Sequence, residues 1–540
     1  MIVPFVLFIF AVVVCVVYEF RGIPMMAPDI LTVQTATSVM GNYTFKLTFE
    51  QYSVILVCMA FFFTFLRLHE VKVTEKRVFH IAGFIVVALG CGLFTNQIIL
   101  SDFMEEHQIN IRMFRPMESY QKYGGVLTFA RSVGYAVVKK PEGYTTAKVD
   151  QIIQEYEKKS ANEQQSTAKQ YPNIITVVNE TFADIKVLGD FKTNEDYMPY
   201  FHSLKKNCVT GYTYASIVGG QTANTEFELL TGNTLGFLSA GTTAFQLYIH
   251  GQMPSLVSNL KAEGYSGNKA MHPFNPYNYN RPAVYKDFGF TDFIDKFDFP
   301  KNVKRVREYI SDEANVDRII SEYEKNRKKT DQPFYMYNMT IQNHSPYDKD
   351  AANFKQPIKI ESSKYDAEAN RYLNLIKYSD DSLKQLTGYF EKCKEPTIIL
   401  FLGDHQPRLT DEFMNKITNG QYQTWSSEQM MKRYQVPFVI WANYDIKEQH
   451  IEKTSMNYIQ SILTKTAGVK MTGYQRFLNE VRKEVPTITS QGYWGKNGKF
   501  YQINDKGSPY YGIIQKYRMI QYNMMFDKKN RRDSFFEVSK

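Results

Sequence analysis

Long apolar runs are confined to the first hundred residues of the chain. They cover residues 1–18, 50–67 and 79–100. A helix needs roughly 20 apolar residues to cross the hydrocarbon core of a bilayer, with ~17 as a lower limit. A single run of this length could equally form a buried core helix. Three runs in succession favour a membrane region over residues 1–100 with about three transmembrane helices.

The positive charges around these runs predict which side of a membrane each loop occupies. The loop at 67–77 carries four Lys or Arg residues, whereas the longer loop at 21–51 carries two. Short loops rich in Lys and Arg face the cytoplasm, so everything after about residue 101 is expected outside the cell. The first run begins at residue 1 without a basic stretch before it, which is untypical of a signal peptide. We therefore expect the natural chain to begin further upstream.

Beyond residue 100 the apolar pattern changes to short segments. Residues 101–170 are polar and helix-prone, and we expect a helical linker there. From residue 171 to 530, apolar runs suited to buried strands alternate with amphipathic helical patterns. The strand-like runs are 173–178, 334–339, 397–402 and 438–442, and the clearest helical patterns are 315–326 and 368–392. This alternation predicts an α/β domain with a mostly parallel sheet flanked by helices, followed by a tail at 531–540.

The composition disfavours two classes of protein. The 64 basic and 55 acidic residues leave a formal charge of +9, which is small for 540 residues. No basic stripe with interleaved aromatic residues is present, so we expect no nucleic-acid partner. Five cysteines without metal-site spacing do not make a disulfide scaffold. Cys208 and Cys393 alone lie in the polar part of the chain; they could form one disulfide, but two unpaired thiols are favoured.

Polar residues that could carry chemistry follow three of the predicted strands. They are Glu180, Asn343, His344, Asp404 and His405. Ligand sites in open α/β sheets lie at the carboxyl ends of the strands, and a charge placed there is costly unless it is paired or binds a metal. Each residue also has a plainer interpretation, as a helix cap, a structural pair in a turn or a satisfied loop histidine. Their common position at strand ends favours a functional site.

Thr222 stands where the turn GGQ enters the helical pattern TANTEFELL, and it is either a helix cap or a nucleophile. Glu180, Asp404 and His405 offer two carboxylates and one imidazole. This donor set suits Mn²⁺, Mg²⁺ or Zn²⁺ and does not select among them. Metal coordination would lower the pKa of the threonine hydroxyl enough to make it a nucleophile.

A phosphoryl group is the substrate that these residues suit. The amino terminus of the helix at Thr222 favours an anion, and Arg281 and His344 could bind phosphate oxygens or protonate a leaving group. Because no nucleotide triphosphate is available outside a membrane, the activated group would arrive on a lipid or be exported already activated.

Five motifs resemble, in order, those of the lipoteichoic acid synthase family. They are NIITVVNE, QTANTEF, NYNRPAVYKDFGF, IQNHSPY and LGDHQPRL. The resemblance covers roughly residues 20–530, and residues 20–45 are similar to the family's extracellular loop between membrane helices. It implies an extracellular, sulfatase-like domain of the alkaline-phosphatase superfamily, preceded by transmembrane helices. Members usually have five membrane helices, so the resemblance also implies a missing pair before Met1.

The resemblance also implies roles for individual residues. One divalent metal ion, usually manganese, is held by a glutamate, the nucleophilic threonine and an Asp-His pair. The implied metal ligands are Glu180, Thr222, Asp404 and His405. The family's Trp-Asn-Arg segment and a later histidine contact the phosphoglycerol, and Tyr279 stands here in place of the tryptophan. The implied substrate-binding residues are Tyr279, Asn280, Arg281, His344 and His272.

The reaction implied by the resemblance is phosphoglycerol transfer. A glycerophosphate group would move from the phospholipid phosphatidylglycerol, through a phospho-threonine, to a hydroxyl of a cell-envelope polymer or glycolipid. A phosphoethanolamine transferase or a phosphodiesterase of the same superfamily fits the same residues. A sulfatase is disfavoured, because the stretch ANTEF after Thr222 lacks the Pro and Arg of a Cys/Ser-x-Pro-x-Arg pattern. A non-enzymatic sensor would be favoured only if a metal ligand were missing.

Overall fold

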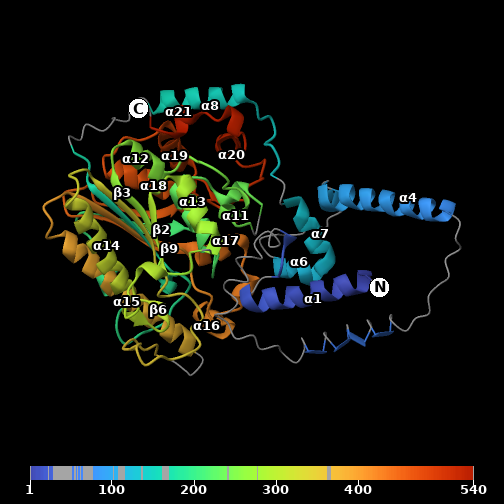
Figure 1. Ribbon diagram of the computed structural model, residues 1–540, viewed down its shortest axis with the longest axis horizontal. Coiled ribbons are helices and arrows are strands. Elements are labelled where there is room, and N and C mark those ends of the chain that lie inside the picture. The colour runs from blue at the N-terminus through green and yellow to red at the C-terminus, as the bar shows by residue number, and fades with distance from the viewer. Residues whose placement is uncertain are drawn as a thin grey trace. The chain divides into compact units, whose positions relative to one another are not determined.

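The structure of the protein is a computed structural model that describes residues 2–21, 24–27, 52–53, 56–57, 59–60, 63–64, 77–100, 103–106, 116–135, 138–160, 170–239, 242–276, 278–361 and 366–538. The chain forms two compact units (Figure 1). The first comprises residues 1–139 with 239–242, and the second comprises 140–238 with 243–540. Each unit is described by itself.

The first unit is helical in its described residues. Its helices are α1 (Ile2–Arg21), α4 (Arg77–Phe94), η2 (Thr95–Leu100), α5 (Phe103–Glu106), α6 (Pro116–Tyr123) and α7 (Gly125–Tyr135). The first apolar run of the sequence therefore forms α1, and the third forms α4 and η2. The predicted helix at 50–67 lies mostly outside the described residues.

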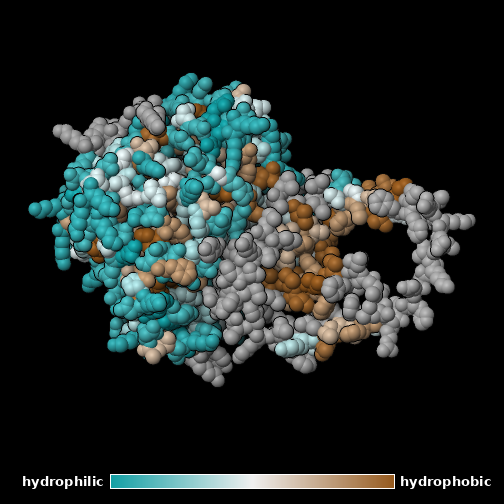
Figure 2. Space-filling view, viewed as in Figure 1, coloured by the Kyte–Doolittle hydropathy of each residue, from teal (hydrophilic) through white to brown (hydrophobic). Residues whose placement is uncertain are grey.

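Apolar side chains of α4 are exposed in this unit, and Figure 2 shows them in brown. They are Ile85, Val86, Val87, Leu89, Leu93 and Phe94. Within the part of the chain that the structure describes, no helix is both long and apolar enough to cross a membrane. The predicted transmembrane helices are therefore not confirmed.

The second unit is built on an eight-stranded sheet. Its strands lie in the order β10-β2-β9-β8-β1-β7-β3-β4. Their bounds are β1 (Asn173–Asn179), β2 (Cys208–Tyr214), β3 (Ser266–Met271), β4 (Asp292–Ile294), β7 (Phe334–Met339), β8 (Thr397–Gly403), β9 (Gln435–Ala442) and β10 (Gln449–Ser455). β9 runs antiparallel to β8 and β2, and the remaining pairs are parallel. The predicted mostly parallel sheet is thus confirmed.

Side chains of the central strands alternate between two apolar cores. In β1, Ile174 and Val178 belong to one core, while Ile175 and Val177 belong to the other. This alternation follows from the two-residue period of a strand. Both faces of the sheet are therefore buried, which explains why β1, β7 and β8 were visible in the sequence as continuous apolar runs.

Helices cover both faces of the sheet (Figure 1). They are α8 (Thr146–Lys159), α9 (Pro199–Ser203), α10 (Thr222–Thr231), α11 (Ala244–Leu247), α12 (Leu256–Ala262), α13 (Arg281–Phe288), α14 (Asp312–Arg327), α15 (Ala367–Phe390), α16 (Asp411–Ile417), α17 (Ser427–Met430), α18 (Met456–Thr466), α19 (Gly473–Glu484), α20 (Tyr511–Met525) and α21 (Asp533–Phe536). The helices predicted at 315–326 and 368–392 are α14 and α15. Small sheets are formed by β5 (Arg305–Val306) with β6 (Tyr309–Ile310), and by β11 (Thr487–Thr489), β12 (Gly492–Trp494) and β13 (Phe500–Tyr501).

Two predicted boundaries differ from the structure. The compact second unit begins at Lys140 rather than at residue 171, because α8 packs on it through Tyr156, whose ring lies 4.6 Å from that of Phe477. The segment 531–540, predicted to be a tail, contains α21, whose Phe535 and Phe536 are buried. The cysteine prediction is confirmed, because Cys208 and Cys393 are both free thiols.

Candidate functional site

The carboxyl ends of β1, β7 and β8 bring the predicted strand-end residues together. β1 lies between β7 and β8 and runs parallel to both, with Val178 opposite Met339 and Asn179 opposite Gly403. Glu180, the loop of Asn343 and His344, and the pair Asp404-His405 therefore leave the sheet at one edge. Gly403 is required at this edge because a Cβ there would lie 1.8 Å from the carbonyl oxygen of Phe182.

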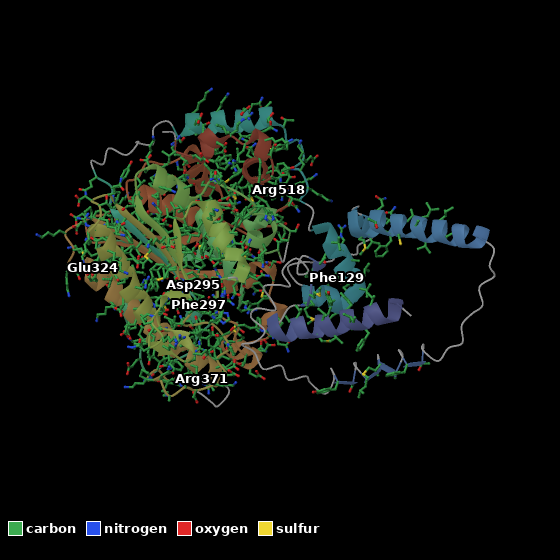
Figure 3. All side chains as sticks on the ribbon, in the orientation of Figure 1. Phe129, Asp295, Phe297, Glu324, Arg371 and Arg518 are labelled. Carbon is green, nitrogen blue, oxygen red and sulfur yellow. The ribbon has the colours of Figure 1, made fainter. Side chains whose placement is uncertain are left out.

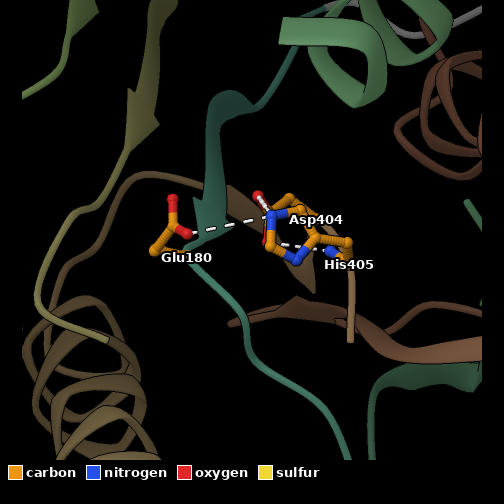
Figure 4. A group of neighbouring side chains, drawn as sticks. All are labelled: Glu180, Asp404 and His405. Carbon is orange, nitrogen blue, oxygen red and sulfur yellow. Dashed lines mark hydrogen bonds and ion pairs between the residues drawn. The ribbon is translucent and has the colours of Figure 1, made fainter. Parts of the chain in front are cut away.

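Glu180, Asp404 and His405 form a buried group of ligand atoms (Figure 4). One atom from each side chain lies within 4.8 Å of the other two. Asp404 Oδ1 accepts the backbone N–H groups of Thr181 and His405, at 2.7 and 2.8 Å. His405 Nδ1 lies 3.0 Å from the carbonyl oxygen of Gln406, to which it donates. Nε2 of His405 thereby faces the two carboxylates, 3.2 Å from Asp404 Oδ2 and 3.8 Å from Glu180 Oε1.

The donor atoms of this group fit a divalent cation. Asp404 Oδ2 and His405 Nε2 are both buried without a hydrogen-bond partner among the described residues, and such atoms are costly unless something binds them. Burial, together with the negative charge of Asp404, raises the pKa of Glu180 well above its ordinary value. A cation among the three residues would satisfy both orphaned atoms and offset the repulsion between the carboxylates.

Thr222 lies beside this group at the start of α10. Its Oγ1 is 3.5 Å from Glu180 Oε2, to which it donates. The helix is capped by Gln221, whose backbone is left-handed with φ of 66° and whose side chain makes no capping bond. The interpretation of Thr222 as a plain N-cap is therefore wrong: its hydroxyl points to the carboxylate instead of bonding the first turn of the helix.

Two contacts tie the threonine helix to the end of β8. Thr225 Oγ1 donates to the carbonyl oxygen of Asp404 at 2.8 Å. The N–H of Gly219, in the turn before the helix, donates to the carbonyl oxygen of Gln406 at 2.9 Å. The bond of Gly219 before Thr222 and the bond of Thr225 after it therefore fix the position of Thr222 relative to Asp404 and His405.

Arg281 is buried and ion-paired rather than free. It begins α13, is 1% exposed, and donates from Nε and Nη2 to Glu226 Oε1 at 3.1 and 2.7 Å. Glu226 Oε2 also accepts the hydroxyls of Tyr285 and Tyr337. Sequence reasoning missed Glu226, although its spacing of four residues from Thr222 places both on one side of a helix.

His272 and His344 have different surroundings. His272 is buried, and its Nδ1 lies 3.0 Å from the carbonyl oxygen of Met339. Burial and the charge of Arg281 lower the pKa of His272 well below its ordinary value, so it is neutral. His344 is half-buried, with Nδ1 2.7 Å from its neighbour's carbonyl at Ser345, and burial lowers its pKa also.

Arg307 and Asn343 hold the loop that carries His344. The sequence did not predict a structural role for either residue. Arg307 donates to the carbonyl oxygens of Gln342 and His344, at 2.9 and 2.7 Å. Asn343 donates to Asn179 Oδ1 and to the carbonyl of Glu180. Asn343 was predicted as a residue that could carry chemistry. In the structure its side chain instead bonds Asn179 and the backbone of Glu180, and so helps to position the site.

Strained backbone is concentrated at this edge of the sheet. Eight described residues other than glycine have a clearly positive φ, and five of them are candidate site residues or adjoin one: Thr181, Gln221, Tyr279, Asn280 and Arg307. Left-handed conformations in such residues cost of order 1–3 kcal/mol and cluster where function requires them. The Tyr279 ring lies 5.1 Å from the guanidinium of Arg281, and Asn280 is exposed. Their substrate-binding role remains a prediction.

Fold and site together define an α/β domain with a mostly parallel sheet and a threonine beside a metal-ligand group. Residues 172–469 match the family model described as Sulfatase, which is more than half of the chain. The chain thus belongs to the sulfatase family, and its motifs resemble those of the lipoteichoic acid synthases.

Known proteins similar to this chain agree with that assignment. A putative cyclic beta-1,2-glucan modification protein of Rhizobium meliloti is 30% identical over 433 residues, covering 79% of this chain and 65% of its own length. The lipoteichoic acid synthase of Staphylococcus saprophyticus is 23% identical over 374 residues, or 66% of this chain and 55% of its own. The chain spans between 35% and 65% of the length of the first three curated relatives it matches.

Solved structures share the fold of the second unit. The Streptococcus pyogenes phosphoglycerol transferase GacH, in complex with sn-glycerol-1-phosphate, is similar with a TM-score of 0.60 at 20% identity, covering 74% of this chain and all (100%) of its own. The Listeria monocytogenes lipoteichoic acid synthase LtaP has a TM-score of 0.51 at 19% identity, covering 70% of this chain and 98% of its own. At these identities the likeness shows the fold alone.

Metal binding should stabilise the protein through this group. Adding Mn²⁺ to the metal-stripped chain at 100 times its Kd should stabilise the fold by about 2.7 kcal/mol, seen as a rise in the thermal unfolding temperature. Asp404→Asn should abolish the rise, yet leave the metal-free protein no less stable, because one of two crowded carboxylates is gone. Asp331→Asn, whose side chain is 98% exposed, is the matched control and should keep the full response. A Mn²⁺-induced rise in Asp404→Asn equal to the wild type's would place the ion elsewhere.

Proposed function

We propose that the chain is a metal-dependent phosphoglycerol transferase that acts through a covalent phospho-threonine at Thr222. The observation that carries the proposal is the placement of the Thr222 hydroxyl, 3.5 Å from Glu180 and at the start of α10. A hydroxyl without a metal group or base nearby is a poor nucleophile. Here it adjoins Glu180, Asp404 and His405, whose donor atoms fit a cation and of which Asp404 Oδ2 and His405 Nε2 have no hydrogen-bond partner among the described residues.

The residues divide the first half of the reaction among them. Thr222 Oγ1 attacks the phosphorus of the phospholipid headgroup, the new bond forming as the bond from phosphorus to the diacylglycerol oxygen breaks. The threonine proton has a route to Glu180 Oε2, to which the hydroxyl already donates, and the departing diacylglycerol takes up a proton. When bound by Glu180, Asp404, His405 and Thr222, a divalent metal would supply a lower threonine pKa and offset the charge on the phosphoryl oxygens.

The second half transfers the group to an acceptor. An acceptor hydroxyl attacks the phosphorus from the side opposite Oγ1 as the phosphorus–threonine bond breaks. The acceptor loses one proton and the departing Oγ1 gains one, so that the Thr222 hydroxyl is regenerated. Arg281, fixed by Glu226, contributes positive charge near the site. Neutral His272, with a proton on Nδ1, presents Nε2 as an acceptor suited to a hydroxyl of glycerol rather than to a phosphate oxygen.

Donor and acceptor are assigned from the relatives. We take phosphatidylglycerol as the donor, because lipoteichoic acid synthases and a phosphoglycerol transferase are among the proteins that this chain resembles. We take a hydroxyl of a cell-envelope polymer or glycolipid as the acceptor, and the named glucan modification protein supports a glucan. Manganese is the proposed metal, by resemblance to the family.

The membrane is the proposed setting of this reaction. The apolar sequences of α1 and α4, the exposed apolar side chains on α4 and the basic loop at 67–77 support a multi-pass anchor with the second unit outside the cell. A lipid donor and an envelope acceptor would both be reached from that side.

Mass spectrometry of the intact full-length protein tests the donor. We would incubate the detergent-solubilised protein with Mn²⁺ and vesicles of phosphatidylglycerol, and in parallel with phosphatidylethanolamine. Phosphatidylglycerol should add the mass of one glycerophosphoryl group and release diacylglycerol. An adduct from phosphatidylethanolamine alone would make the chain a phosphoethanolamine transferase, and release of the headgroup into water without any adduct would make it a hydrolase; either result would overturn the assignment.

A further inference from the structure

A strip of aromatic and basic side chains leads from His344 to the surface of the second unit. The Phe274 ring stacks on the imidazole of His344, with centroids 6.2 Å apart and planes at 23°. Lys296 Nζ then lies 5.8 Å from the centroid of Phe274 and 5.1 Å from that of Phe297. We call His344, Phe274, Lys296 and Phe297 the aromatic strip. Its inner end is a candidate residue of the active site and its outer end is in solvent.

The backbone that carries the outer ring is held in place although the ring itself is exposed. Phe297 is 73% exposed and belongs to the short 3₁₀ turn η6 (Lys296–Asp298). Asp295 caps this turn in a capping box with Asp298, and its Oδ1 accepts the N–H of Phe297 at 2.7 Å. Figure 3 shows Phe297 beside Asp295. Because the turn is already ordered, a ligand that packs on the ring has only the side chain to immobilise, which lowers the entropic cost of binding.

Exposure of such a ring is unusual in this unit. Among the described residues from 140 to 538, Phe297 is the only large hydrophobic side chain that is exposed, and the visible face of the unit is mostly hydrophilic (Figure 2). Scattered apolar side chains are ordinary on protein surfaces. Here the exposed ring is linked to His344 through cation–π contacts of Lys296 with Phe297 and Phe274, and through the stacking of Phe274 on His344. A ligand that binds Phe297 could therefore also reach the candidate active site.

The size and charge of the strip select one class of ligand. A stable protein partner would need about 800 Å² of contact on this side, and a lipid surface would need a broad apolar face; one exposed ring supplies neither. A polyanion would meet the carboxylates of Asp295 and Asp298 beside the ring, and like charges there would disfavour it. A neutral sugar has an apolar ring face for Phe297 and hydroxyls for Lys296 and the carboxylates.

We propose that the aromatic strip is the acceptor subsite and that it binds a sugar ring of a neutral glycan. The inference rests on the proposed function. It narrows the acceptor from a cell-envelope polymer or glycolipid in general to a neutral carbohydrate. The sugar would stack on Phe297 and Phe274 with Lys296 donating to its hydroxyls, and the next sugar hydroxyl would lie at His344.

Sugar binding to the full-length protein tests the proposal independently of catalysis. The probes are a short linear β-1,2-linked gluco-oligosaccharide and an N-acetylglucosamine oligomer. Their binding is detected by saturation-transfer NMR, and the Kd is measured by calorimetric titration. We expect at least one to bind, Phe297→Ala to weaken its Kd about tenfold, and Phe297→Tyr to restore binding, because the tyrosine ring can stack in the same place. Lys296→Ala should weaken binding as well, whereas Lys301→Ala, at an exposed lysine beyond the turn, should not.

The outcomes separate this inference from the proposed function. Equal Kd values for wild type and Phe297→Ala would overturn the subsite, as would binding of a glycerophosphate oligomer but of neither sugar. The phosphatidylglycerol adduct on the wild-type protein is scored separately. A protein that forms the adduct but binds no sugar retains the transferase assignment and loses the acceptor subsite. A protein that binds sugar through Phe297 but forms no adduct retains the sugar site and loses the transferase assignment, and with it the role of that site as an acceptor subsite.

Discussion

Thr222→Ala should abolish headgroup transfer while leaving the protein folded. Loss of a covalent nucleophile costs catalysis at least ~10³-fold, because no other group can form the intermediate. The hydroxyl makes one long hydrogen bond, at 3.5 Å, so its removal should change the free energy of unfolding by no more than about 1 kcal/mol. Diacylglycerol release from phosphatidylglycerol and the intact mass of the protein measure the two halves of this prediction.

Two variants make the Thr222 result specific. Thr222→Ser keeps a hydroxyl at the helix start and should still gain the glycerophosphoryl mass, at a lower rate. Thr231→Ala removes a buried hydroxyl from the other end of the same helix, where it bonds the carbonyl of Phe227, and should retain transfer within a few-fold. Near-normal transfer by Thr222→Ala would mean that water or the acceptor attacks the lipid directly.

Glu226→Ala should be the most destabilising single substitution around the site. It would leave the guanidinium of Arg281, which is 1% exposed, without its carboxylate. Breaking a buried ion pair by removing one partner costs about 3–5 kcal/mol, because an uncompensated charge remains inside the protein. Tyr285 and Tyr337 would lose their acceptor at the same time. The unfolding midpoint in urea, followed on the full chain, measures the effect.

A double-mutant cycle assigns the loss to the pair. Glu226→Gln combined with Arg281→Met should cost less than the sum of the two single changes, because the double variant leaves no buried charge unpaired. The surface pair of Arg371 with Asp350, whose aspartate side chain is 70% exposed, provides the comparison: Asp350→Ala should barely move the midpoint. Additive effects of Glu226→Gln and Arg281→Met would show that the two residues are not coupled, contrary to the geometry.

The sequence predicted the central strands because both of their faces are buried. β1, β7 and β8 consist of almost unbroken apolar residues, and the polar residues that end them are conspicuous for that reason. The outer strands β2, β3 and β10 contain glycine, lysine, threonine and histidine. Their partial exposure removes the apolar signal, so the sequence alone did not reveal how many strands the sheet has.

The sequence predicted which residues belong to the candidate site, but only some of the contacts between them. Parallel strand ends implied that Glu180, Asp404 and His405 meet, and the structure brings them together. The pairing of Arg281 with Glu226 could not be foreseen, because the two lie 55 residues apart and their side chains meet only in the folded domain. Arg281 was expected to be available to phosphate, and its main partner is instead a carboxylate.

The strand order of the sheet also fixes when the protein can become active during its synthesis. β1 pairs on its two sides with β7 and β8, which begin at residues 334 and 397, whereas β1 itself begins at 173. Glu180 and Thr222 therefore leave the ribosome long before Asp404 and His405, and no shorter nascent chain contains a complete metal-ligand group. Contacts this distant in sequence form late in folding. A chain that ends before His405 thus lacks the complete metal-ligand group, so the proposed catalysis requires that nearly the whole second unit has been made.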